Sequence, residues 1–194
     1  MPSNKVRKVD SRGFSLVELL VTISILVVIT SIVLVNQNRF GGNIMLSNLA
    51  YQAALTIRQA QTYGLAVREA GAGTGNFSGA YGVHFSSANL TQLIVFVDSD
   101  GSGKYTDASE NVVISNISGA NRIASFCGTL AGGTQKCNPE ITSLDVLFRR
   151  PDPDAIIKSD IVGDTYGSAL ITFISPQGLT RNVYVAVTGQ ISVQ

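Results

Sequence analysis

Residues 12–35 read RGFSLVELLVTISILVVITSIVLV, and this stretch decides how the rest of the chain is organised. From Phe14 to Val35 it is an uninterrupted apolar run of 22 residues with a single charge, Glu18. An α-helix rises about 1.5 Å per residue, so the run would cover roughly 33 Å, the thickness of the hydrocarbon core of a bilayer. The sequence therefore predicts a membrane-spanning helix over 14–35.

Glu18 needs an explanation within this helix. A carboxylate costs about 2.5–3.5 kcal/mol at the centre of a bilayer and less near its edge. The next cation toward the C-terminus is Arg39, which is too far along the chain to reach Glu18. A partner for this carboxylate must therefore come from another part of the protein or from another molecule.

The residues before the apolar run are mostly basic. An excess of Lys and Arg keeps a flank in the cytoplasm, so the N-terminus is expected there and the chain after Val35 outside. A secretory signal peptide would have a shorter apolar region and a small-residue cleavage site, whereas NQNR follows here at 36–39. An ordinary signal anchor fits the length but does not explain the acid. The flanking charges are Lys5, Arg7, Lys8 and Arg12, against Asp10.

Residues 12–18, RGFSLVE, resemble the type IV prepilin signature: a short basic leader ending in Gly, then Phe, three residues, Glu and an apolar helix. The resemblance implies that a prepilin peptidase cleaves between Gly13 and Phe14 and methylates the new N-terminus at Phe14. It also implies that Glu18 pairs with the terminal ammonium of a neighbouring subunit during filament assembly. The partners implied are the prepilin peptidase, the membrane and other pilin or pseudopilin subunits.

Later segments resemble the GspH/FimT branch of minor pilins and pseudopilins, more loosely than the N-terminus does. The resemblance implies an α+β fold, in which the second half of a long N-terminal helix packs on an antiparallel β-sheet head. The residues from 148 to 154, FRRPDPD, depart from the pattern, and their prolines predict a sheet edge or a bulge there. The matching segments are LTIRQAQ at 55–61, VFVDSDGSG at 95–103, SPQG at 175–178 and GQISV at 189–193.

The domain organisation follows from these patterns. We expect a leader at 1–13, the membrane and filament-core helix at 14–35, the second half of the helix at 36–69 and a β-rich head at 70–194. Gly41 and Gly42 lower helix propensity by roughly 1 kcal/mol each, so a bend or local melting is expected there. Helical periodicity returns at Leu46, Leu49, Ala53, Ile57, Ala60 and Gly64, whose small members permit close approach of a sheet.

Nine β-rich runs follow the helix, with SPQG at 175–178 predicting a tight hairpin turn between two of them. The Gly-rich residues 70–79 lack phosphate-binding spacing and are interpreted as a linker. The runs are 81–85, 93–97, 112–117, 123–126, 143–148, 155–157, 169–174, 180–187 and 190–193.

Composition narrows the possible functions. The chain has 194 residues and a formal net charge of +1, but the leader carries four basic residues and one acidic residue. The remainder has ten basic and twelve acidic residues, so bulk charge gives no support for a nucleic-acid partner. Cys127 and Cys137 are expected to form a disulfide, because they lie on the side of the membrane where disulfides persist; a metal site at these cysteines is the weaker alternative.

An acidic loop carries oxygen ligands at calcium-loop spacing. Asp98, Asp100 and Ser102 occupy positions one, three and five, with Asp107 further on, but position twelve is Ser109 and the acid Glu110 falls one residue late. The flanks resemble strands rather than helices. A solvated Asp/Gly hairpin loop is therefore preferred to a calcium site, and no cofactor other than this possible Ca²⁺ is expected.

No catalytic constellation is evident, and the protein is not expected to be an enzyme. His84 is interpreted as a surface or hydrogen-bonded structural residue. Arg149 and Arg150, with other head cations, could form a basic strip for nucleic acid, but a solvated face is preferred because no aromatic stacking array accompanies them.

Two functions follow. The first is a minor pilin or pseudopilin: a structural subunit of a type IV pilus or a type II secretion system filament, starting in the cytoplasmic membrane with its head outside and ending in a cell-surface or periplasmic filament. The alternative is a receptor pilin whose head binds DNA or a secreted substrate.

Overall fold

The computed structural model describes residues 13–66, 68–69, 75 and 77–194, except for the side chains of 35–40. The first twelve residues of the predicted leader lie outside the described residues. So do residues 70–74 and 76 of the Gly-rich segment at 70–79. The chain divides into two compact units, 1–40 and 41–194, which are described separately. This division falls five residues after the predicted boundary at 35/36.

A single long helix dominates the N-terminal part of the chain. α1 spans Leu16–Leu65 and includes Gly41 and Gly42 as helical residues, so local melting at the two glycines is not found. It ends four residues before the predicted boundary at residue 69. The segment Leu16–Leu34 of this helix has a mean hydropathy of 2.7, and none of it is buried within the protein. Both properties are expected for a segment with apolar side chains on every face.

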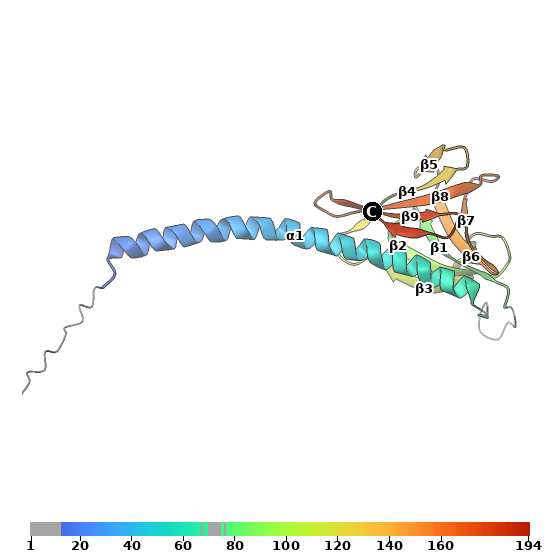
Figure 1. The fold of residues 1–194 in the computed structure, drawn as a ribbon, viewed down its shortest axis with the longest axis horizontal. Coiled ribbons are helices and arrows are strands. Elements are labelled where there is room, and N and C mark those ends of the chain that lie inside the picture. Colours follow the sequence, from blue (N-terminus) through green and yellow to red (C-terminus); the bar gives the residue numbers. More distant parts are fainter. Residues whose placement is uncertain (1–12, 67, 70–74, 76) are drawn as a thin grey trace, which may run out of the picture. The chain divides into compact units, whose positions relative to one another are not determined.

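The second unit is an α+β head, as predicted (Figure 1). The described residues form two antiparallel sheets, with the strand orders β3-β2-β1-β6-β7 and β10-β9-β8-β4-β5. The strands are β1 (Ala80–Ser86), β2 (Asn89–Asp98), β3 (Asn111–Asn116), β4 (Arg122–Leu130), β5 (Gln135–Cys137), β6 (Ser143–Arg149), β7 (Asp152–Ser159), β8 (Tyr166–Ile174), β9 (Thr180–Ala186) and β10 (Ile191–Val193), with the 3₁₀ turn η1 at Ala108–Glu110.

The predicted apolar stripe of the helix lies in the core of the head. Every predicted position from Leu46 to Gly64 is buried, and the large members Leu46 and Ile57 share one hydrophobic cluster with Phe85 of β1 and Phe126 of β4. The helix therefore contributes to the same core as both sheets. Burial of this one-sided stripe against the strands is the main stabilising interaction that sequence periodicity can predict.

Two local predictions at turns are confirmed. Between β8 and β9, the Ser175 carbonyl accepts from the Gly178 N–H at 3.0 Å, and Gly178 has a φ of 79°, which a non-glycine residue rarely adopts. In the 148–154 segment, β6 and β7 form a hairpin whose register shifts between Phe148 and Arg149, and β7 is an edge strand.

The predicted disulfide is present. Cys127 of β4 and Cys137 of β5 lie directly opposite one another in the strand register and are bonded. The three-residue strand β5, which the sequence patterns did not predict, is held at the edge of its sheet by this bond and by its pairing with β4.

Candidate functional site

The start of α1 is built around Ser15 and Glu18. The Ser15 side-chain oxygen accepts a hydrogen bond from the Glu18 N–H at 3.3 Å, and the Ser15 carbonyl accepts from the Leu19 N–H at 3.1 Å. Ser15 is thus an N-cap, with Glu at the third helical position, the arrangement that commonly begins a helix. Gly13 and Phe14 precede this cap, and Phe14 is 78% exposed. The predicted cleavage junction is therefore accessible and lies immediately before the helix.

Hydroxyl side chains in the apolar part of α1 are satisfied within the helix itself. Each donates to a carbonyl three or four residues earlier, at 2.7–2.9 Å, so these groups can enter an apolar environment at low cost. Glu18 is the only ionisable residue of the 16–34 segment, and no cation in the described part of the chain forms an ion pair with it. The donors are Thr22, Ser24, Thr30 and Ser31.

The acidic loop between β2 and β3 forms a second candidate site. It brings together the carboxylates of Asp98, Asp100 and Glu110, whose nearest oxygens lie within 4.8 Å of one another. Asp98 and Glu110 are buried, with 2% and 1% exposure, while Asp100 is exposed. Glu110, one position beyond the twelfth place of a calcium loop, is therefore the third acid of the cluster.

Ser102 and Asp107, which the spacing had grouped with this loop, serve as local structural residues. The Ser102 hydroxyl donates to the Lys104 carbonyl at 2.9 Å. The Asp107 carboxylate accepts from the Ser109 N–H at 2.7 Å and caps η1, and these hydrogen bonds with Ser109 lower the pKa of Asp107. Neither residue is one of the three clustered carboxylates, although Ser102 bonds to one of them, Asp100.

Asp98 is the member of the cluster that has an unsatisfied side-chain oxygen. Its Oδ2 accepts from the Gly103 N–H at 3.1 Å and from the Arg149 guanidinium at 3.2 Å, whereas its buried Oδ1 has no hydrogen-bond partner. Burial raises the pKa of the Asp98 carboxyl, and the adjacent Asp100 adds to this effect, while Gly103 and Arg149 oppose it. The N–H and hydroxyl of Ser102 lower the pKa of Asp100.

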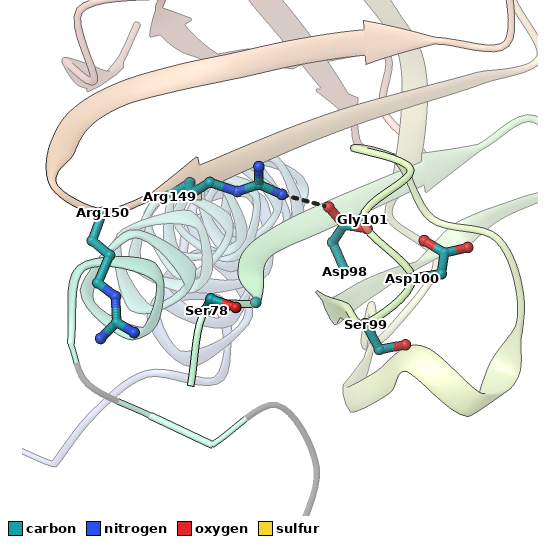
Figure 2. Close-up of a pocket in the computed structure, with 8 residues that line it drawn as sticks. Ser78, Asp98, Ser99, Asp100, Gly101, Arg149 and Arg150 are labelled. Carbon is teal, nitrogen blue, oxygen red and sulfur yellow. Dashed lines mark hydrogen bonds and ion pairs between the residues drawn. The ribbon is translucent and has the colours of Figure 1, made fainter. Parts of the chain in front are cut away.

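The two candidate nucleic-acid residues line a pocket of about 350 Å³ beside this loop. Figure 2 shows their guanidinium groups pointing in different directions, Arg149 toward Asp98 and Arg150 away from it. Arg150 donates to the carbonyl of Phe77. Both cations thus already have acceptors within the protein, and they do not form a common basic strip.

His84 and Asp145 form a buried pair that the sequence did not predict. His84 Nδ1 lies 2.6 Å from Asp145 Oδ1, across the adjacent strands β1 and β6, and the residues are 8% and 1% exposed. Burial raises the pKa of the Asp145 carboxyl, and the hydrogen bond with His84 opposes that shift. The interpretation of His84 as a hydrogen-bonded residue agrees with this geometry, but its acidic partner was missed because only the strand register brings the two together.

One comparison with known proteins gives a match. The prokaryotic N-terminal methylation motif matches residues 9–34, which include the Gly13/Phe14 junction, Glu18 and the apolar half of α1. No curated protein and no solved structure matches the chain. The motif indicates a type IV pilin-like protein that is processed by a prepilin peptidase and assembles with other pilins.

The apolar helix and the motif together indicate a membrane-anchored, structural protein rather than an enzyme. The match covers 26 of 194 residues, so it describes the N-terminal segment and leaves the head to be interpreted from its own structure.

Proposed function

We propose that this protein is a minor pilin or pseudopilin, a structural subunit of a type IV pilus or a type II secretion system filament. The methylation motif, the apolar helix and the α+β head support a subunit of this kind. The resemblance of head segments to the GspH/FimT branch supports a minor subunit. The precursor would lie in the cytoplasmic membrane with its head outside, be cleaved after Gly13 and be methylated at Phe14.

The observation that carries this proposal is the isolated carboxylate of Glu18. It lies one turn into a helix whose other polar side chains in the 16–34 segment bond to the helix itself, so it is left without a compensating charge. Cleavage after Gly13 creates a new ammonium at Phe14. In a filament that staggers subunits by about one turn, the ammonium of one subunit would neutralise Glu18 of its neighbour in the apolar core.

Helix capping is a second reason for a Glu at position 18, besides pairing with an ammonium. An experiment can separate these two roles. A capping arrangement accepts Glu or Gln at the third helical position, whereas charge neutralisation requires the carboxylate. Glu18→Gln should therefore insert into the membrane and begin its helix normally, yet enter filaments much less than the wild type. Thr22→Ala, one turn further on, removes a hydroxyl that bonds only to Leu19 and serves as the matched control.

The test is expression of the full chain with a prepilin peptidase and partner pilins, followed by mass spectrometry of the N-terminus and quantification in sheared filaments. We expect a mature chain beginning with N-methylated Phe14, incorporation of the Thr22→Ala control and strongly reduced incorporation of Glu18→Gln. A wild-type chain that still begins at Met1, or normal incorporation of Glu18→Gln, would contradict the proposal.

The receptor function stays a prediction that no contact in the described head favours. Arg149 is paired with Asp98 and Arg150 with a backbone carbonyl, so DNA phosphates would have to compete with internal acceptors. A salt-dependent gel shift with the full chain in detergent tests it, since phosphate-driven binding weakens as salt rises. Binding that is lost in an Arg149→Ala/Arg150→Ala variant would support the receptor function.

A further inference from the structure

The acidic loop brings three carboxylates close together, and Lys158 reaches the same loop by donating from Nζ to the Ser102 carbonyl at 3.3 Å. Glu110 Oε1 accepts from the N–H and hydroxyl of Ser99, at 3.1 and 3.4 Å, and Oε2 accepts from the N–H and hydroxyl of Thr106, at 2.8 and 2.9 Å. All four donors are neutral, so they solvate the carboxylate without cancelling its charge. Among the described contacts of the three clustered acids, the only cation is Arg149, which bonds to Asp98.

An independent feature points to a missing ligand. The Asp98 side chain is fully buried, and its Oδ1 has no hydrogen-bond partner although its Oδ2 has two. Leaving a buried acceptor unsatisfied is costly, and a carboxylate oxygen more so than a neutral one. Figure 2 shows Asp98 and Asp100 next to one another among the residues that line the pocket. The orphan oxygen therefore belongs to the same group of acids.

We propose that Asp98, Asp100 and Glu110 bind one calcium ion. Asp98 Oδ1 would gain its missing partner, Asp100 would close the exposed side, and Glu110 would share an oxygen now solvated by a hydroxyl, with water completing the coordination. The donors are all oxygen, which suits a hard cation, and calcium tolerates the irregular, flexible coordination of a hairpin loop better than magnesium does. The proposal concerns the head alone and does not depend on the filament function.

The position of Glu110 explains how a loop with imperfect calcium spacing can still gather three acids. In a helix-flanked calcium loop the last ligand stands at the twelfth position. Here the loop is flanked by strands, and the 3₁₀ turn at Ala108–Glu110 brings the thirteenth residue back to the two N–H groups of Ser99 and Thr106. The site proposed from geometry therefore contains Glu110 in place of Ser102 and Asp107.

A proton shared between the Asp98 and Asp100 carboxyls is the competing explanation for how these acids lie so close together. Asp98 and Asp100 are close enough for a proton on one carboxyl to bond to the other, which would also reduce the charge of the cluster. The explanations differ in their response to calcium, because a shared proton alone predicts no binding of the ion, whereas a calcium site binds it with release of any such proton. They also differ for Asp98→Asn, which keeps hydrogen-bonding capacity while removing a charged ligand.

The test is calcium titration of the full chain in detergent micelles after treatment with a chelator, by calorimetry and by thermal unfolding. With three carboxylates and one nearby guanidinium, we expect a Kd of about 10⁻⁴ to 10⁻³ M and a Tm that rises with calcium concentration. Asp100→Asn, at an exposed position, should weaken binding at least tenfold. Asp154→Asn, an exposed acid on β7 outside the cluster, is the matched control and should bind as the wild type does.

Three results would overturn the proposal. The first is a wild-type protein whose Tm and heat signal do not change up to about 10 mM calcium, above the range of weak extracellular sites. The second is unchanged affinity in both Asp98→Asn and Asp100→Asn, which would locate any binding elsewhere. The third is an equal loss in Asp154→Asn, which would reduce the effect to general surface charge.

Discussion

At Gly64 the helix packs directly against the backbone of β6, and replacing this glycine with Ala tests the packing of the head. A Cβ at this position would lie 2.3 Å from the carbonyl oxygen of Phe148 and 2.8 Å from its carbonyl carbon. Phe148 is fixed on β6, between Tyr81 of β1 and Ala155 of β7. Its backbone cannot yield as a flexible side chain would, so the helix end or the sheet must shift.

The expected cost follows from two opposing effects. Overpacking in a close-packed interior costs about 1–3 kcal/mol, and a contact this short belongs at the upper end. The shift also strains the hydrogen bond from the Arg150 N–H to the Gly64 carbonyl, which is 3.2 Å long. Replacing Gly by Ala in a helix returns up to about 1 kcal/mol. The Gly64→Ala variant should therefore lose about 2 kcal/mol, or about 4–8 °C in Tm for a chain of this size.

Gly41 supplies the matched control, because it lies in the same helix and an added Cβ there meets nothing within 4 Å. Gly41→Ala should gain up to about 1 kcal/mol from helix propensity alone. Both variants are measured as full chains in detergent by circular dichroism during thermal and urea unfolding. If Gly64→Ala were as stable as Gly41→Ala, the close helix–sheet contact would not exist in solution and the reasoning would be refuted.

Three further predictions concern the rest of the head. Cys127→Ser/Cys137→Ser should lower the free energy of unfolding by about 3 kcal/mol, because the unfolded chain loses a closed loop, and its melting curve should no longer respond to reductant. His84→Ala should cost about 3 kcal/mol, because the buried Asp145 carboxylate would lose His84 and keep the weaker hydrogen bond from the Tyr105 N–H at 3.3 Å, whereas the double variant His84→Phe/Asp145→Leu should recover much of that loss in urea unfolding. Partial burial alone would raise the pKa of Asp160, but hydrogen bonds from Thr142 and from Ser143, the first residue of β6, lower it. The contribution of Asp160 to stability is therefore present above about pH 4 and lost as the pH falls through the folded pKa. Asp160→Asn should therefore show a smaller acid-induced drop in Tm than the wild type, and an equal drop would exclude this hydrogen-bonded carboxylate as a contributor.

The sequence predicts those features of the fold that arise from local periodicity. The spacing of Leu46, Ile57 and Gly64 places them on one helical face, and that face is buried, because an amphipathic helix has only one way to remove its apolar side chains from water. The turn at 175–178 and the bulge in the 148–154 segment follow equally from backbone preferences of Pro and Gly.

Features that depend on strand register were not predictable. The pair of His84 and Asp145 exists because β1 and β6 align these residues, although they are 61 positions apart in the chain. The replacement of Asp107 by Glu110 in the acidic cluster depends on η1, whose three residues leave no periodic signal. A buried acid within the apolar run Leu144–Phe148 was the one visible hint of the first pair, since a buried carboxylate requires a partner.

The two parts of α1 use the same helical geometry under different constraints. After residue 40, the apolar stripe from Leu46 to Gly64 recurs every three or four positions and is covered by the protein's own strands, while apolar side chains on the other faces, such as Met45 and Leu55, stay exposed. In Leu16–Leu34 apolar side chains cover the whole circumference, and none of the segment is buried within the protein. A lipid bilayer can cover such a surface, and so can the apolar helices of other subunits, but only an arrangement that also provides a cation accommodates Glu18. Under the proposed function, cleavage after Gly13 would expose such a cation at Phe14, and the helix-lined core of a filament would then be the more favourable environment for Glu18.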